Sequence, residues 1–455
     1  MTNDDCGPVD DSVLYGQANH ISTTIWNREL REKLTIRQST SNLGQWRLND
    51  YQVHLLQQWG FGKFVNPKSV MQNDVCLITA VVERWRPETN TFHFTFGEMT
   101  VTLEDVYMLM GLPVVGEPIK VDDEIPGKKT WFLRWHDPAL TDEERKSALD
   151  RGGVKLNFLR EKYGTCPSST DRDMMVIYMR AYVLYLCGAI LFPTKSNNAV
   201  HPRLILYLED SNKIYGYAWG AAVLAYLYRN LKEASRKDVK SISGCTTVLM
   251  LWSRERLRPG QPLIAAHTRM IWPRALAWAV ALVSAGRSKY YNIHHNIDAY
   301  RGMFDNFYLE WLRWRPYERF YRRDDEHFER ALIAGIARVP LHYFEDVEYQ
   351  LPERVPRQFN MPFCILPYPP TNMRDLRTAR GMSELCLHEM PPVFHDSILP
   401  TFVRGYDEFM LETFGPTYER PDFKNVPPKR KARRTMESTS QPFESEYFKE
   451  YEAYQ

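Results

Sequence analysis

Residues 81–118, VVERWRPETNTFHFTFGEMTVTLEDVYMLMGLPVVGEP, hold the densest run of local structure signals in the chain. A helix leads into them, because apolar residues recur at helical spacing from Val75 to Trp85. Asn73 or Asp74 can cap the start of this helix, and Pro87 predicts its end at about residue 86.

A short β-hairpin is predicted next, near residues 91–102. Its first strand alternates aromatic with polar residues, which is typical of a strand with one apolar face; the aromatic residues are Phe92, Phe94 and Phe96. Gly97 and Glu98 can form the tight turn, and Met99 and Val101 alternate on the returning strand.

A capped helix is predicted to follow the hairpin. The Thr102 hydroxyl can accept a hydrogen bond from the amide of Asp105, whose carboxylate can reach back to Thr102 as a capping box. Apolar residues then continue to Gly111, which supplies the usual helix stop.

Charged residues gather where the first helix meets the hairpin, at Glu83, Arg84, Arg86 and Glu88. They allow two interpretations. One is a charged helix end that supports a buried hairpin, and the other is the rim of a site that binds a charged ligand.

The string of residues 81–118 closely resembles the signature of the plant mobile domain family, also called aminotransferase-like plant mobile domain proteins, which includes "maintenance of meristems"-like proteins. Other segments resemble the family in the same order and cover most of residues 13–360. They are HISTTIWNREL (20–30), WGFGKFVN (59–66), YVLYLCGAILFPTKSNNAVHPRLILYLED (182–210), YAWGAAVLAYLYRNL (217–231), LWSRERLRPGQP (251–262) and VPLHYFEDVEYQLPERVPRQF (339–359). Ser253 departs from the pattern, which commonly has an aromatic residue or Ala there.

The resemblance implies a nuclear protein that acts in transposon silencing, gene regulation or meristem maintenance by binding other proteins. A phosphatase-like protein with a related domain is an implied partner. No catalytic residue carries over from the family. Nothing around Lys195, Lys213 or Lys289 singles out a pyridoxal phosphate site, so "aminotransferase-like" is interpreted as nomenclature.

The chain of 455 residues is longer than one hydrophobic core usually supports, which predicts two lobes or an elongated helical body. Its 44% hydrophobic and 25% charged residues are ordinary for a globular protein, and a net charge of +2 argues against a protein that coats polyanions along its whole surface. The seven cysteines are scattered, which excludes CxxC zinc knuckles and favours a reducing compartment.

No membrane association is expected. The N-terminus is acidic and lacks the apolar segment of a secretory signal. Residues 174–192 are nearly all apolar, but Arg180 lies among them and Pro193 ends them, so they are interpreted as a buried helix.

The fold class is predicted to be mainly α, a multi-helix globular body in two lobes with the small hairpin. The predicted organisation is a flexible N-terminus (1–12), a first helical part with the hairpin (13–119), a charged excursion (120–172) and a second helical part (173–360). A proline-rich segment with a terminal helix (361–414) and a disordered tail with a basic cluster (415–455) complete it.

Aromatic residues and arginines alternate through residues 300–323, YRGMFDNFYLEWLRWRPYERFYRR. The aromatic residues fall at helical spacing, which favours a core stripe with a solvated basic face. The alternative is a nucleic-acid-binding module of transposon origin, whose contacts would be Arg301, Arg313, Arg315, Arg319, Arg322 and Arg323.

A basic cluster, PPKRKARR, lies in the tail at residues 427–434. An exposed hexamer of this kind suits an import receptor and predicts a nuclear protein. A solvated charge run and direct DNA contact are the alternatives. The cluster consists of Lys429, Arg430, Lys431, Arg433 and Arg434.

No catalytic, cofactor-binding or metal-binding motif is found in the sequence. There is no P-loop, GxSxG elbow or HExxH helix, and the metallophosphatase strings GDxHG, GDxVDRG and GNHE are missing. The histidines do not group at ligand spacing. A non-enzymatic protein is therefore expected, and an enzyme with an unrecognised pocket is the remaining alternative.

Overall fold

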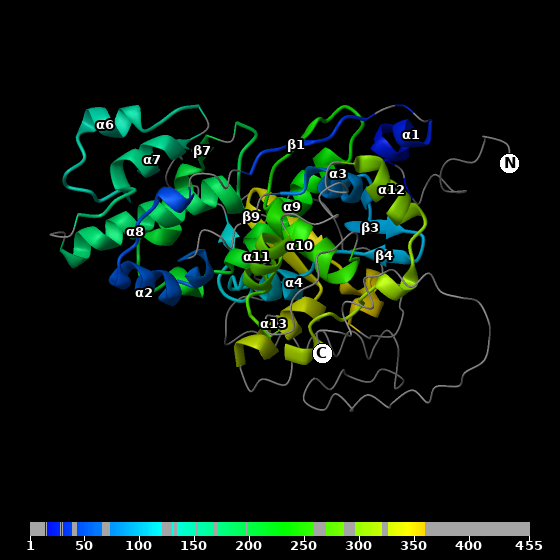
Figure 1. The fold of residues 1–455 in the computed structure, drawn as a ribbon. Coiled ribbons are helices and arrows are strands. Elements are labelled where there is room, and N and C mark those ends of the chain that lie inside the picture. Colours follow the sequence, from blue (N-terminus) through cyan, green and yellow to red (C-terminus); the bar gives the residue numbers. More distant parts are fainter. Residues whose placement is uncertain are drawn as a thin grey trace, which may run out of the picture. The chain divides into compact units, whose positions relative to one another are not determined.

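Helices dominate the part of the chain that the computed structural model describes, as the sequence predicts (Figure 1). The description covers residues 14–359 except 15, 28, 30, 39–42, 66–72, 121–129, 132–133, 152, 168–170, 197, 259–269, 286–295 and 321–325. The α-helices are α1 (Ile21–Trp26), α2 (Asp50–Gln58), α3 (Val75–Val82), α4 (Leu103–Met110), α6 (Asp142–Ser147), α7 (Leu156–Tyr163), α8 (Arg172–Leu186), α9 (Trp219–Ala234), α10 (Thr246–Arg256), α11 (Arg274–Ala285), α12 (Ile297–Asp305) and α13 (Glu326–Ile336).

Within the described residues, ten short strands form four small sheets. The sheet orders are β2-β3-β4, β10-β9-β5, β1-β8 and β6-β7. Pairing is antiparallel except between β1 and β8 and between β5 and β9. The strands are β1 (Thr35–Ile36), β2 (Trp85–Arg86), β3 (Thr91–Phe94), β4 (Gly97–Met99), β5 (Ile119–Lys120), β6 (Val154–Lys155), β7 (Ala199–Val200), β8 (Ser241–Ile242), β9 (Val339–Phe344) and β10 (Asp346–Gln350).

Short 3-10 and π-helical segments complete the described elements. Most are 3-10 turns, and a π-helical turn (Cys187–Leu191) extends α8. The 3-10 turns are Gln17–Asn19, Leu43–Gln45, Gly62–Val65, Pro202–Leu208, Ile214–Gly216, Leu309–Trp311, Glu318–Phe320, Pro352–Arg354 and Pro356–Gln358.

The first predicted helix ends four residues earlier than expected. Helix α3 begins after Asp74, whose Oδ1 accepts a hydrogen bond from Leu77 N at 3.0 Å, and it stops at Val82. Trp85 and Arg86 are extended instead and pair with Thr91 and Phe92. Pro87 disfavours the helical conformation in the residue before it, and here that residue becomes a strand.

The hairpin is confirmed, but its turn lies two residues earlier than predicted. Phe94 pairs with Gly97, so Thr95 and Phe96 form the connection and Gly97 begins the returning strand. The helix after the hairpin is as expected: Thr102 and Asp105 form a full capping box, and Gly111 ends α4 with a φ of 65°.

The aromatic face of the hairpin packs into the core. The ring of Phe92 lies 4.8 Å from Trp85 and 4.9 Å from Trp252, and it is fully buried. Phe94 stacks on Phe96 and contacts Phe304 of α12. The hairpin therefore packs against β2, α10 and α12.

The β9–β10 hairpin was not predicted, and it fastens α4 to the rest of the core. Gln350 accepts a hydrogen bond from Leu103 N at 2.8 Å and donates to the carbonyls of Ala334, Gly335 and Ala337. Nearby, Gln358 both accepts from the amide and donates to the carbonyl of Thr100. Buried amide side chains thus hold the start of α4 in place.

Helix α8, with its π-helical extension to Leu191, is long and apolar enough to cross a membrane by length and composition. However, 72% of its most apolar window is buried inside the protein. Arg180 donates a hydrogen bond to the carbonyl of Glu209. This arrangement is that of a core helix, as the sequence predicts.

The division into lobes stays a prediction. All the described residues belong to one unit, Met1–Pro421, and the second unit, Asp422–Gln455, lies outside the described residues. Two short helices, α6 and α7, occupy the segment predicted as a charged excursion. Residues 1–12, 361–414 and 415–455 also fall outside the description.

Candidate functional site

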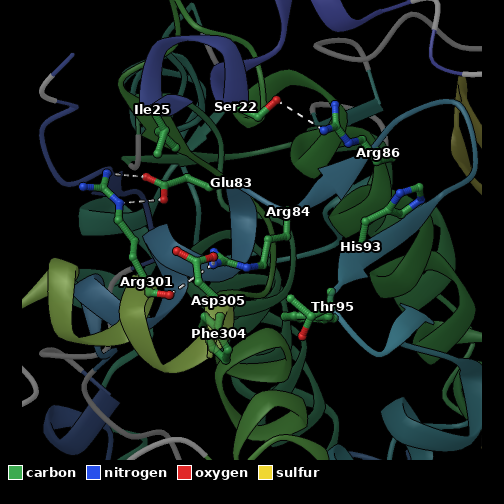
Figure 2. A pocket seen from close by; sticks show the side chains of 11 residues that line it. Ser22, Ile25, Glu83, Arg84, Arg86, His93, Thr95, Arg301, Phe304 and Asp305 are labelled. Carbon is green, nitrogen blue, oxygen red and sulfur yellow. Dashed lines mark hydrogen bonds and ion pairs between the residues drawn. The ribbon is translucent and has the colours of Figure 1, made fainter. Parts of the chain in front are cut away.

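A cavity of about 690 Å³ opens where α1, the end of α3, the β2–β3 pair and α12 meet. Figure 2 shows its lining side chains, which come from both ends of the described chain. The lining residues are Ser22, Ile25, Glu83, Arg84, Arg86, His93, Phe94, Thr95, Arg301, Phe304 and Asp305. Three of the four charged residues at the predicted rim are among them.

Two ion pairs fix the α12 side of the cavity. Arg301 binds Glu83 through two hydrogen bonds of 2.8 and 2.9 Å, and a third bond of 2.9 Å reaches Asp298. Arg84 Nη2 lies 2.6 Å from Asp305 Oδ1. Because each pair joins α12 to the end of α3, their main effect is to hold these two elements together.

Arg86 is held in a different way. Its Nη1 donates to Gln17 Oε1 at 2.6 Å and its Nη2 donates to Ser22 Oγ at 3.2 Å, so both partners are neutral. Its Nε is buried, with no hydrogen-bond partner among the described residues. Burial lowers the pKa of Arg86, while the nearby Glu88 carboxylate raises it.

Ser22 and His20 lie within hydrogen-bond distance at the edge of the cavity. His20 Nε2 is 2.7 Å from the carbonyl of Trp85, which assigns the proton to that nitrogen. His20 Nδ1 therefore accepts, and it lies 2.8 Å from Ser22 Oγ and 3.1 Å from Ser22 N. The second contact caps α1, so the imidazole also has a structural role.

Burial and, after it, the positive charge of Arg86 lower the pKa of His20 to about 3. The His93 pKa is also lowered, first by burial, while Glu98 raises it. Both imidazoles are therefore neutral near pH 7. The cavity is lined by three guanidinium groups against two carboxylates, which leaves an excess of one positive charge.

Apolar side chains form the other wall of the cavity. Ile25 comes from α1, Phe94 from β3 and Phe304 from α12. The Arg84 guanidinium lies 4.9 Å from the Phe304 ring centre and fixes the position of that ring. The cavity thus combines guanidinium groups with aromatic rings.

Behind the hairpin, α10 carries three consecutive charged residues, and all three are buried. Each of them binds a different neighbouring helix. Arg254 lies 3.5 Å from Asp74, at the start of α3. Glu255 accepts from Arg274 at 2.7 Å and from the Trp278 indole at 2.9 Å, both on α11. Arg256, the third, binds α4. This hub was not predicted, although the segment LWSRERL places three charges in an otherwise apolar helix.

The predicted basic aromatic helix 300–323 does not form. Helix α12 ends at Asp305, a separate 3-10 turn covers Leu309–Trp311, and Tyr308 is 65% exposed. Asn306, the residue that ends α12, is not helical. The predicted core stripe therefore holds for Tyr300 and Phe304, which are buried, and is wrong for Tyr308.

The described arginines of this segment have different surroundings. Arg301 lines the cavity, Arg315 pairs with Glu318 at 3.0 Å, and Arg319 lies over the ring of Phe320. Arg313 is exposed. Arg322 and Arg323, and the basic cluster Lys429, Arg430, Lys431, Arg433 and Arg434, lie outside the described residues.

Across the described part of the chain, no group of three or more His, Cys, Asp or Glu side chains could hold a metal ion. The four described cysteines, at 76, 166, 187 and 245, are free thiols. The sequence predicts the charged rim of the cavity but not the residues of the other walls. Ser22 and Phe304, which lie more than 280 residues apart in the chain, carry no local signal that they meet.

Comparisons with known proteins identify relatives of this chain. The plant mobile domain model matches residues 60–379. Protein MAIN-LIKE 1 of Arabidopsis thaliana is 38% identical over 360 residues, which are 78% of this chain and 67% of that protein. Protein MAINTENANCE OF MERISTEMS of the same plant is 34% identical over 352 residues, 77% of this chain and 70% of that protein.

A further relative is a serine/threonine-protein phosphatase 7 long form homolog of Arabidopsis thaliana, 34% identical over 405 residues. The match covers 84% of this chain but only 28% of that protein. No solved structure matches the chain. The family model covers well over half of the sequence and includes the hairpin, α4, α10 and the cavity wall from α12. The chain belongs to the plant mobile domain family.

Proposed function

We propose that this protein works in the nucleus by binding other proteins and not by catalysis, with a role in gene regulation, transposon silencing and meristem maintenance. Its similarity to Protein MAINTENANCE OF MERISTEMS supports the developmental part of this proposal. The basic cluster at residues 429–434 supports the nuclear part.

The properties of Ser22 and His20 support the proposal that the protein is not a catalyst. A serine nucleophile needs a base that takes its proton near neutral pH. His20, with a pKa of about 3, is too weak a base for this role. The Ser22 oxygen also accepts hydrogen bonds from Arg86 and Gln17, which lowers its electron density and its nucleophilicity.

A fluorophosphonate probe tests this conclusion directly, since it labels activated serines. We expect Ser22 to stay unlabelled in the folded protein at pH 7.5, as a Ser22→Ala variant does. Labelling that is confined to Ser22, and that disappears in His20→Gln, would overturn the non-catalytic proposal and establish an acyl-transfer site.

The partner is proposed to be a phosphatase-like protein that carries a related domain. The relation to a phosphatase 7 long form homolog supports this choice, because this chain corresponds to about a quarter of that longer protein. Affinity purification of the tagged full chain from plant nuclei is expected to enrich such a protein. A tagged chain recovered only from the cytosol, with no nuclear partner, would contradict the proposal.

Nucleic-acid binding is the second candidate, and the exposed Arg313 beside the exposed Tyr308 and Leu309 favours it. A phosphate-binding surface of this kind gives an affinity that falls steeply with salt. Binding of single-stranded DNA that is lost in Arg313→Ala and retained in Arg301→Ala would favour this candidate, because Arg301 is already neutralised by Glu83 and Asp298.

A further inference from the structure

We propose that the cavity between α1, the hairpin and α12 binds an aromatic acid, meaning an aromatic ring that carries one carboxylate or phosphate group, with the oxyanion at Arg86 and the ring packed against the wall that Phe94 and Phe304 form together. This assignment goes beyond the proposed nuclear role and does not depend on it.

The distribution of charges around the cavity favours an anionic ligand. Arg301 is neutralised by Glu83 and Asp298, and Arg84 is neutralised by Asp305. Arg86 has no carboxylate within ion-pair distance in the described structure. The nearest acid, Glu88, is directed to the backbone of Gly16, whose amide donates to its Oε1 at 2.7 Å.

The hydrogen bonds of Arg86 hold its guanidinium in a position from which it can bind an anion in the cavity. Gln17 and Ser22 each accept one of its five N–H donors, so the guanidinium is held in a fixed position while it still lines the cavity. A fixed guanidinium loses little side-chain entropy on binding, and its planar fork matches the oxygens of a carboxylate or phosphate. Figure 2 shows Arg86 and His93 together at one side of the cavity and Phe304 at another.

The apolar wall of the cavity favours a ligand with an aromatic ring. Phe94 is half-buried and stacks on Phe96, and Phe304 is fixed by Arg84, so both rings are held in place before a ligand arrives. Aromatic rings pack against such a wall in stacked or edge-on arrangements. The volume of about 690 Å³ is in the range of small-ligand sites and far above that of a single ion.

Calorimetric titration of the full chain tests the proposal with phenyl phosphate, benzoate and inorganic phosphate as probes. Phenyl phosphate is expected to bind more tightly than inorganic phosphate, because only the former can occupy the aromatic wall. A phosphotyrosine peptide is a further probe. If it binds more tightly than phenyl phosphate, the ligand is a side chain of a protein, and if it binds more weakly, the ligand is a free small molecule; both outcomes support the site.

Arg86→Gln is expected to weaken phenyl phosphate binding by about 10- to 100-fold, the range for loss of hydrogen bonds to a charged group. Arg315→Gln is the matched control, since Arg315 is also half-buried but lies outside the cavity. Phe94→Leu is expected to remove the preference for phenyl phosphate over inorganic phosphate.

Thr95→Trp provides an independent block, because Thr95 is exposed at the rim and its replacement leaves every charge in place. Binding of phenyl phosphate should be lost in this variant while its melting temperature is retained. The proposal is overturned if no probe binds, if phenyl and inorganic phosphate bind equally, or if Arg86→Gln and Arg315→Gln weaken binding by the same factor. None of these outcomes bears on the nuclear partner, which affinity purification tests separately.

Discussion

Arg256 and Asp105 form an ion pair in which neither side chain is exposed to solvent, with Arg256 Nε 2.8 Å from Asp105 Oδ1. Tyr317 donates its hydroxyl to the same oxygen at 3.0 Å, and Glu104 lies 3.6 Å from Arg256 Nη2. Burial alone would lower the pKa of Arg256, but Asp105, Tyr317 and Glu104 outweigh it and the pKa is raised. Because Asp105 also closes the capping box of Thr102, this pair joins the end of α10 to the start of α4.

Arg256→Gln is expected to destabilise the protein by about 3–5 kcal/mol, because it leaves the carboxylates of Asp105 and Glu104 buried without their cation. Urea denaturation measures the loss. Arg354→Gln is the control, since Arg354 pairs with Glu98 at the surface and its loss should cost less than about 1 kcal/mol. Equal losses in the two variants would show that burial of the Arg256 pair has no energetic importance.

Gly111→Ala is expected to cost more than about 1 kcal/mol. Gly111 has a φ of 65°, which side chains rarely adopt, and a Cβ there would lie 2.5 Å from Pro273 Cγ. Gly44→Ala is the matched control, because a Cβ at Gly44 meets no atom within 4 Å. Thermal denaturation should separate the two variants by about 1–2 °C for each kcal/mol lost, because the unfolding entropy of a chain this long is large. A melting temperature for Gly111→Ala equal to that of Gly44→Ala would contradict the prediction.

The elements that the sequence predicts well are those with local causes. Thr102, Asp105 and Gly111 define the ends of α4 through hydrogen bonds and conformations that lie within a few residues of one another. The hairpin turn was misplaced because Gly97, a typical turn residue, is used here to begin a strand with a φ of 126°. The alternation of the phenylalanines predicts the strand but does not fix its register.

Contacts between distant segments could not be predicted in the same way. The aromatic spacing after Tyr300 continues past Asp305, but the helix ends there, so periodicity alone overestimates it. Arg86 is expected at a charged rim, yet its partner Ser22 lies 64 residues away, and Arg301 reaches Glu83 across 218 residues. No sequence pattern near these residues predicts that such pairs form.

Nuclear import is expected to depend on the basic cluster at residues 429–434. A fluorescent fusion that lacks residues 427–434 should redistribute from the nucleus to the cytoplasm, because import receptors bind exposed basic segments. Exchanging each Lys for Arg and each Arg for Lys in the cluster keeps the charge and should retain nuclear fluorescence. An unchanged distribution after the deletion would refute the role of the cluster.

His342 is expected to make the stability of the protein depend on pH. It lies on β9, is 3% exposed, and neither ring nitrogen has a hydrogen-bond partner among the described residues. Burial, with a smaller effect of Lys120, lowers its pKa from 6.5 to about 4. The unfolded chain therefore binds a proton on this residue at a higher pH than the folded chain does.

Stability from neutral His342 is accordingly complete above pH 6.5 and is lost as the pH falls from 6.5 toward 4, by about 3 kcal/mol in total. His342→Phe cannot bind a proton, so its free energy of unfolding should fall less over this range. Other buried histidines, such as His20, titrate equally in both proteins and cancel in the difference. Urea denaturation at pH 7.5, 6, 5 and 4 measures the difference in the free energy of unfolding between the wild-type protein and His342→Phe. This difference should be constant above pH 7, and below pH 7 it should change steadily in favour of the variant. A difference that is the same at every pH would mean that His342 is equally able to bind a proton in the folded and unfolded chains, and that its burial does not exclude the charged imidazole.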